Sequence, residues 1–107
     1  MIRRDISEFV RGWFIGNFEP SLLKTDQFEV GLLTHTKGEK HPNHYHSQVT
    51  EYNVLVKGKM LMHGEVIEPG DVFVLLPDEI ADPVFLEDCT VLCVKQPSIP
   101  GDKHEVL

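Results

Sequence analysis

The sequence predicts an all-β protein with a single domain. Three observations support this prediction: the chain has only 107 residues, its stretches of helical periodicity are short, and from residue 28 onward short β-prone runs alternate with Gly, Pro and Asp. The composition, 41% hydrophobic and 25% charged, is that of a folded domain rather than of a disordered or fibrous chain. Many short strands at close spacing are typical of a sandwich or a barrel and not of a βαβ fold.

The first 27 residues are expected to form a short irregular segment that precedes the barrel. Asp5 is a candidate N-cap for a helix over residues 5–11, which Gly12 would end. The stretch that follows is rich in aromatic residues, namely Trp13, Phe14 and Phe18. An aromatic cluster outside the main strands packs over one mouth of a barrel, contacts a second subunit, or stacks on a ligand. The sequence leaves these three alternatives open.

The barrel is predicted over residues 28–98, and residues 99–107 are expected to form a C-terminal tail. The runs with strand character are residues 28–37, 44–46, 51–58, 59–62, 65–68, 71–76, 83–87 and 90–96. The dipeptide His63-Gly64 lies between two of these runs and predicts a tight hairpin.

The net charge and the cysteine content indicate which classes of partner and which cellular compartment to expect. The formal net charge is −7, which argues against nucleic acid and anionic membranes as partners. Cys89 and Cys93 would lie on one face of a strand roughly 13 Å apart, too far for a disulfide. The charged N-terminus lacks the apolar stretch of a signal peptide, and no apolar run is long enough to span a membrane. We therefore expect a soluble, cytoplasmic protein.

A histidine pair provides the main functional signal. His44 and His46 stand two residues apart, so on a strand both imidazoles project from the same face. Glu51 follows after a polar stretch that offers a turn, and it would face the pair from the next strand. Two imidazoles and one carboxylate suit Fe, Mn, Ni, Co or Zn.

The spacing of these residues resembles that of a known family. Gly38, His44, His46, Glu51 and Gly58 fall at the positions of the first signature motif of the cupin superfamily. The stretch EPGDVFVLLPDEIAD, which follows, is similar to the second cupin motif. The resemblance implies a small single-domain cupin-type β-barrel (a double-stranded β-helix, or jelly roll) like those of bacterial and phage cupins of undefined activity.

The resemblance also implies a ligand set for a divalent first-row transition metal. It carries over His44, His46 and Glu51 directly as ligands. Asp82 occupies the position of the fourth ligand, which is usually a histidine, and Glu79 stands where a glycine is usual. An aspartate at position 82 would bind the metal directly, bind it through water, or cap a turn beside Pro83.

Three functions are compatible with this pattern. The first is a metal-binding cupin, oxygenase-like or isomerase-like, that binds or transforms a small polar molecule inside the barrel. The second is a non-catalytic module that binds a sugar or a small acid. The third resembles metal-free sugar-nucleotide ketoisomerases, in which His44 or His46 would move a proton.

Two further expectations concern His41 and the assembly. His41 precedes Pro42 in the loop before the motif, so it is a candidate catalytic acid or base at the barrel mouth or a solvated loop histidine. A small barrel has exposed sheet edges, and pairing them is a common solution. We therefore expect a homodimer, with the aromatic segment around Trp13 as the candidate contact.

Overall fold

The computed structural model of the chain describes residues 1–106 and confirms the all-β prediction. Its strands are β1 (Trp13–Gly16), β2 (Leu23–Lys24), β3 (Glu29–His35), β4 (His44–Tyr45), β5 (Thr50–Lys57), β6 (Met60–Met62), β7 (Glu65–Ile67), β8 (Val72–Leu75), β9 (Val84–Phe85), β10 (Cys89–Gln96) and β11 (His104–Glu105). Two 3-10 turns, η1 (Ile6–Glu8) and η2 (Val10–Gly12), precede β1. Within the described residues, no helix is long and apolar enough to cross a membrane.

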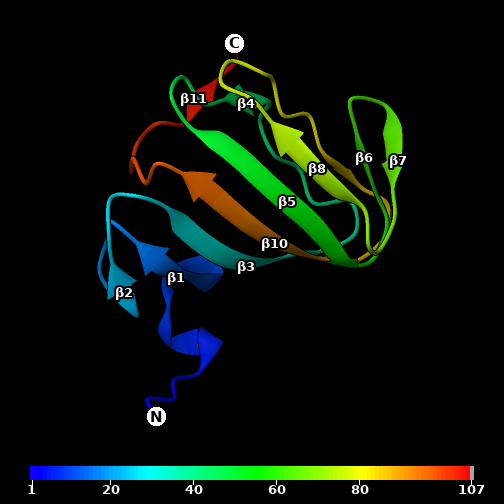
Figure 1. The fold of residues 1–107 in the computed structure, drawn as a ribbon. Coiled ribbons are helices and arrows are strands. Elements are labelled where there is room, and N and C mark those ends of the chain that lie inside the picture. The colour runs from blue at the N-terminus through cyan, green and yellow to red at the C-terminus, as the bar shows by residue number, and fades with distance from the viewer. Residues whose placement is uncertain (107) are drawn as a thin grey trace.

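One large sheet forms most of the barrel wall. Its strand order is β2-β1-β3-β10-β5-β8, and two small sheets, β11-β4 and β7-β6-β9, lie across from it (Figure 1). The long strands β3, β10 and β5 pair antiparallel in unbroken ladders apart from one irregularity near Val91. Because side chains alternate along a strand, one face of this sheet lines the barrel interior and the other faces outward.

The core fills the end of the barrel near the β6–β7 hairpin. It consists of buried apolar side chains, namely Leu55, Met60, Met62, Leu75, Ala81, Phe85, Cys89 and Val91. Both cysteines are free and buried, as their spacing predicts. His63 and Gly64 form the tip of the β6–β7 hairpin, and both have positive φ, which is the geometry that a two-residue hairpin turn favours.

The N-terminal segment is less helical than its pattern predicts. Asp5 does act as an N-cap, with a complete capping box to Glu8, but the turn ends at once because Phe9 is extended. The segment then passes into β1, where the Trp13 ring lies directly against Gly31 of β3. Figure 1 shows the N-terminus projecting beyond this edge of the large sheet.

Candidate functional site

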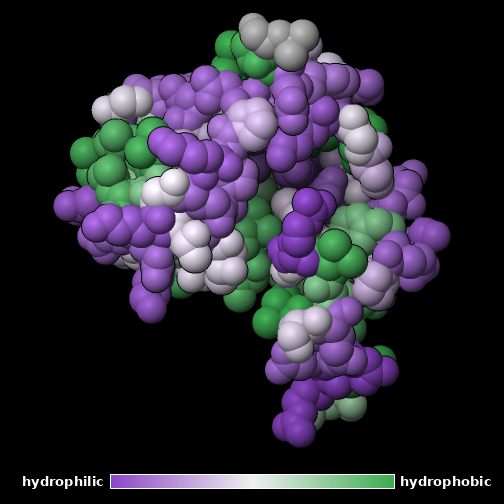
Figure 2. Space-filling view, turned by 180° about the vertical axis from the view of Figure 1, so that it is seen from behind, coloured by the Kyte–Doolittle hydropathy of each residue, from purple (hydrophilic) through white to green (hydrophobic). Residues whose placement is uncertain are grey.

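A cavity of about 780 Å³ lies inside the barrel and reaches the core side chains Met60, Met62, Leu75, Ala81, Phe85 and Val91. Its walls come from the inward faces of β3, β5, β8 and β10, together with the N-terminal segment and the loops around β4 and β9. Figure 2 shows a hollow in this region, with hydrophobic surface inside and a hydrophilic rim. His44 and Glu51 of the motif line this cavity, while His46 lines a neighbouring cavity of about 340 Å³.

His46 is held in one orientation by the C-terminal segment. Its Nδ1 contacts the backbone carbonyl oxygen of Asp102. A carbonyl only accepts, so Nδ1 donates a proton to it; in the neutral imidazole the lone pair then lies on Nε2. That Nε2 is buried and has no hydrogen-bond partner among the described residues, and it lies 3.9 Å from Oε2 of Glu51. A ring nitrogen and a carboxylate oxygen at this separation need a cation or a proton between them, and a metal-ligating histidine is commonly held through its second nitrogen in this way.

Glu51 is held in place by the neighbouring strand. The thiol of Cys93, on β10, donates a hydrogen bond of 3.1 Å to Oε1 of Glu51. Burial raises the pKa of the Cys93 thiol, and the nearby Glu51 carboxylate raises it further, so the thiol stays protonated and acts as a donor. Oε1 is thereby occupied, which leaves Oε2 directed toward His46.

His44 stands beside His46 but faces the larger cavity. The two imidazole centroids are 5.4 Å apart, and the rings are nearly perpendicular. Burial lowers the pKa of His44, and the positive charge of Lys103 lowers it further. His44 is therefore neutral at pH 7 and carries a lone pair for a metal or a proton.

The C-terminal tail completes the site, which the sequence pattern did not indicate. Strand β11 pairs with β4, and this pairing brings Asp102 to the loop between His46 and Glu51. There the Asp102 carboxylate accepts four hydrogen bonds from the loop, from the backbone amides of Ser47, Gln48 and Val49 and from the Ser47 hydroxyl, and Nε2 of His104 lies 3.0 Å from its Oδ1. The loop that sets the spacing of His46 and Glu51 thus depends on one distant carboxylate.

Asp82 is not brought to the three motif residues. Ala81 forms the bridge to His44 and lines the cavity, and alternation turns the next side chain away. The Asp82 carboxylate instead accepts a hydrogen bond of 2.8 Å from the backbone amide of His63. Of the three alternatives raised by the sequence, this contact matches the capping of a turn.

A second cluster lies at the rim of the larger cavity. Nδ1 of His35 is 2.7 Å from Oε2 of Glu39, and Nε2 of His41 contacts the same oxygen. His35 also stacks on Phe85 with 4.2 Å between centroids. These hydrogen bonds hold the pKa of Glu39 at about 2. His41 is thus paired with a carboxylate at the cavity wall, and its catalytic role stays a prediction.

The two clusters differ in how closely their ligand atoms converge. Within residues 1–106, only His35, Glu39 and His41 place one potential ligand atom each within 4.8 Å of one another. The motif residues are wider apart. Within the described part of the chain, Nε2 of His46 and Nδ2 of Asn53 are the two buried side-chain atoms without a hydrogen-bond partner. Such atoms are rare in proteins without an explanation, and a metal ion held with Glu51 would supply one for His46.

Solved structures share this fold. A DMSP lyase, DddQ from Ruegeria pomeroyi, is similar with a TM-score of 0.73 and 16% identity over 88% of this chain and 49% of that chain. A conserved protein with a double-stranded β-helix domain from Klebsiella pneumoniae has a TM-score of 0.68 and 18% identity over 92% of this chain and 87% of its own. A cupin-superfamily sugar phosphate isomerase from Silicibacter pomeroyi has a TM-score of 0.55 and 22% identity over 67% of this chain and 52% of its own.

At these identities the likeness establishes the fold, which is that of a small cupin-type double-stranded β-helix, as the motif predicts. The chain spans about half the length of the DMSP lyase. No family model matches the chain, and no curated protein matches it.

Proposed function

We propose that this protein is a metal-binding cupin that binds or transforms a small polar molecule inside its barrel. The observation that carries the proposal is Nε2 of His46, a buried ring nitrogen that has no hydrogen-bond partner within residues 1–106 and faces the carboxylate of Glu51. The cavity beside it is large enough for a small organic molecule. The fold alone does not choose an activity, because one scaffold supports many reactions.

In this proposal His44, His46 and Glu51 hold a divalent first-row metal, which is Fe, Mn, Ni, Co or Zn. Such an ion supplies Lewis-acid polarisation of an oxygen ligand, as an isomerase-like or oxygenase-like reaction requires. The chain's own contribution is to fix the ligands: the Asp102 carbonyl orients His46, and the Cys93 thiol orients Glu51. Supporting groups of this kind tune affinity for the ion.

One observation favours a metal-free alternative. His44 lines the cavity, and its lowered pKa makes it a neutral base at pH 7. A neutral imidazole in a ligand cavity moves protons in a reaction like that of the sugar-nucleotide ketoisomerases. The non-catalytic alternative is a barrel that binds a sugar or a small acid without transforming it.

Titration of tag-free protein with Co(II) tests the metal site. We expect one ion per chain, and we expect the His44→Ala, His46→Ala double variant to bind at least about 100-fold more weakly, or about 2.7 kcal/mol. Calorimetry gives the affinity, and the visible absorption of Co(II) reports its ligands.

Two control variants make the titration specific. Asp82→Ala should bind Co(II) as the parent does, because its carboxylate contacts the His63 amide instead of the site. The double variant His35→Ala, His41→Ala should also bind Co(II) as the parent does, because these residues form the separate cluster with Glu39. If only the His35→Ala, His41→Ala variant loses Co(II) binding, the ion binds at that cluster and the proposal is contradicted. Equal Co(II) affinity in the parent and all variants would contradict it as well.

We also propose that the chain forms a homodimer. The contact expected from the sequence is the aromatic segment around Trp13, but the Trp13 ring packs against Gly31 of β3 and lines the cavity, so we place the contact at the opposite edge of the large sheet. Strand β8 ends the large sheet, and its outward side chains Val72 and Val74 are exposed, as is Tyr52 on the neighbouring strand. Edge strands with exposed apolar side chains are commonly paired or covered. Light scattering at tens of micromolar should therefore give about twice the 12.2 kDa of one chain. A mass of one chain would contradict this.

A further inference from the structure

Three cationic side chains gather at the cavity, although the chain as a whole is acidic. Arg11, Lys95 and Lys103 line both the larger cavity and the smaller one, so they lie at the wall that the two share. They outnumber the two carboxylates that line the larger cavity, Glu39 and Glu51, although the smaller cavity adds Glu19, Glu29 and Asp102, and the chain as a whole has 10 Lys and Arg against 17 Asp and Glu. Within residues 1–106, none of the three cations has a carboxylate within 4.0 Å.

Lys95 is the cation built into the barrel wall. It lies on β10 in register with Glu29 on one side and Glu51 on the other, so the three residues form a row across the sheet. Its Nζ is nevertheless placed over the Trp13 ring, 4.8 Å from the centroid. The ammonium is thus held against an aromatic wall and not in an ion pair.

Arg11 and Lys103 face Lys95 from two other segments. Burial lowers the pKa of Lys103, and the charges of Lys95 and Arg11 lower it further, because like charges repel at short range. Arg11 has φ 51°, ψ 30°, a left-handed backbone conformation that is costly for a residue other than glycine. Backbone strain of this kind is found where a side chain serves a binding role.

Repulsion among the three cations would be relieved by an anion bound between them. We infer that the cavity takes a small organic anion, with its carboxylate or phosphate group held by Lys95, Lys103 and Arg11 beside His44. This inference rests on the part of the proposed function that makes the cavity a ligand site, and it names the class of ligand. It does not require the metal, because the cationic groups belong to the chain.

The chain carries its own reporter for such a ligand. Trp13 is the single tryptophan, and Lys95 lies over its ring, so an anion that engages Lys95 changes the surroundings of the indole. We would titrate EDTA-treated protein with D-glucuronate and with inorganic phosphate and follow tryptophan fluorescence. D-Glucose is the uncharged counterpart of glucuronate and should give no saturable change.

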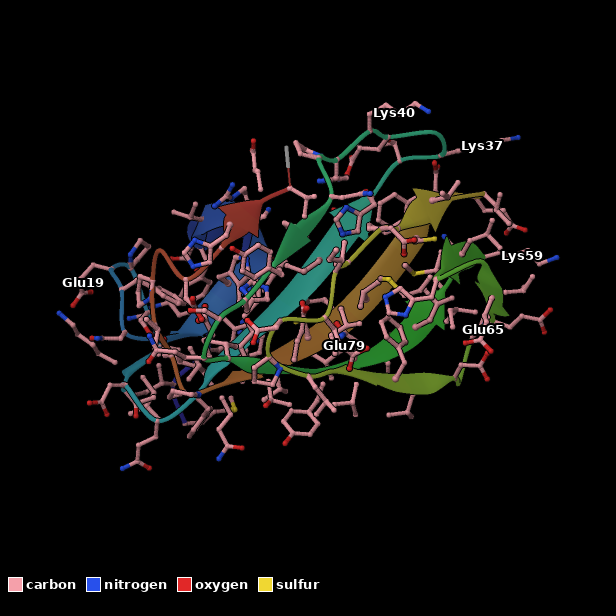
Figure 3. All side chains as sticks on the ribbon, turned by 90° about the horizontal axis from the view of Figure 1, so that it is seen from above. Glu19, Lys37, Lys40, Lys59, Glu65 and Glu79 are labelled. Atoms are coloured by element: carbon pink, nitrogen blue, oxygen red, sulfur yellow. The ribbon has the colours of Figure 1, made fainter. Side chains whose placement is uncertain are left out.

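Lysine variants distinguish the effect of the cavity cations on anion binding from the effect of the net charge of the protein. Lys95→Met and Lys103→Met should each weaken anion binding at least about tenfold, and Lys95→Arg should retain it because the charge stays. Lys40→Met is the matched control: Figure 3 shows Lys40 on the loop between β3 and β4, pointing away from the barrel, so this variant should bind as the parent does. Because Lys103 lies outside the strands, its variant should remain folded even where Lys95→Met does not.

The outcomes distinguish this inference from the metal proposal. Anion binding to metal-free protein that depends on Lys95 and Lys103 supports the inference, even if Co(II) fails to bind. The inference is overturned if neither anion binds, if glucose binds as well as glucuronate, or if Lys40→Met weakens binding as much as the cavity variants do. Normal Co(II) binding in the same preparation would then leave the metal proposal standing.

Discussion

Replacing Asp102 with alanine is expected to lower the free energy of unfolding by about 2–4 kcal/mol. The change removes the carboxylate that accepts hydrogen bonds from three consecutive backbone amides and one hydroxyl. The amide of Val49 is buried, so it would lose its partner without gaining water. Urea unfolding followed by circular dichroism measures the loss.

Asp88→Ala is the matched control for this substitution. The Asp88 carboxylate accepts one exposed hydrogen bond, from the backbone amide of Lys37, and we expect a loss of about 1 kcal/mol or less. The loop held by Asp102 joins His46 to Glu51, so Asp102→Ala should also weaken Co(II) binding by about tenfold or more. Equal losses of stability in the two variants would show that the Asp102 network does not hold the loop.

The same carboxylate makes stability depend on pH. Burial raises the pKa of Asp102, but the hydrogen bonds from Ser47 and Gln48 outweigh it and lower the pKa well below 3.8. A carboxyl with a lowered pKa in the folded state stabilises the protein above its unfolded pKa, and that stability is lost as the pH falls toward the folded pKa. The parent should therefore lose stability steeply below about pH 4, and Asp102→Asn should lose less over that range.

Replacing Gly58 with alanine is expected to lower the free energy of unfolding by about 3 kcal/mol or more, through clash and strain together. Gly58 has φ +98°, and a Cβ atom there would lie 2.3 Å from the backbone oxygen of Asp88 and 2.8 Å from Sγ of Cys89. The backbone oxygen of Asp88 directly precedes β10, so moving it would disturb the start of that strand. Thermal and urea unfolding both report the change.

Gly64→Ala separates the two contributions at Gly58. Gly64 also has a positive φ, +74°, but a Cβ atom there would meet no atom of residues 1–106 within 4 Å. Its substitution should cost only the backbone strain of about 1–2 kcal/mol. If the Gly58→Ala and Gly64→Ala variants are equally stable, then the close contact between residue 58 and the Asp88 backbone is not the reason for a glycine at position 58.

Much of the fold could be predicted from the sequence because its signals are local. Alternating apolar residues mark β3, β5 and β10, and positive φ at His63 and Gly64 explains why that dipeptide forms a hairpin tip. The N-terminal helix was overestimated, because the pattern at residues 5–11 does not show that Phe9 becomes extended. Asp82 was expected near the histidine pair because of its position in the second motif. The backbone bridge between Ala81 and His44 instead decides that Ala81 faces the cavity and Asp82 does not.

By itself, the sequence determined the strands, the turns and the pairing of His44 with His46 on one strand, since each follows from the period of the backbone over a few residues. Only the tertiary structure decided that Asp102, 56 residues after His46, orients that histidine. It also decided that Arg11, Lys95 and Lys103 share one cavity wall. Contacts between distant segments depend on how strands pair and how the barrel closes, and no local period of the sequence encodes which side chains then meet.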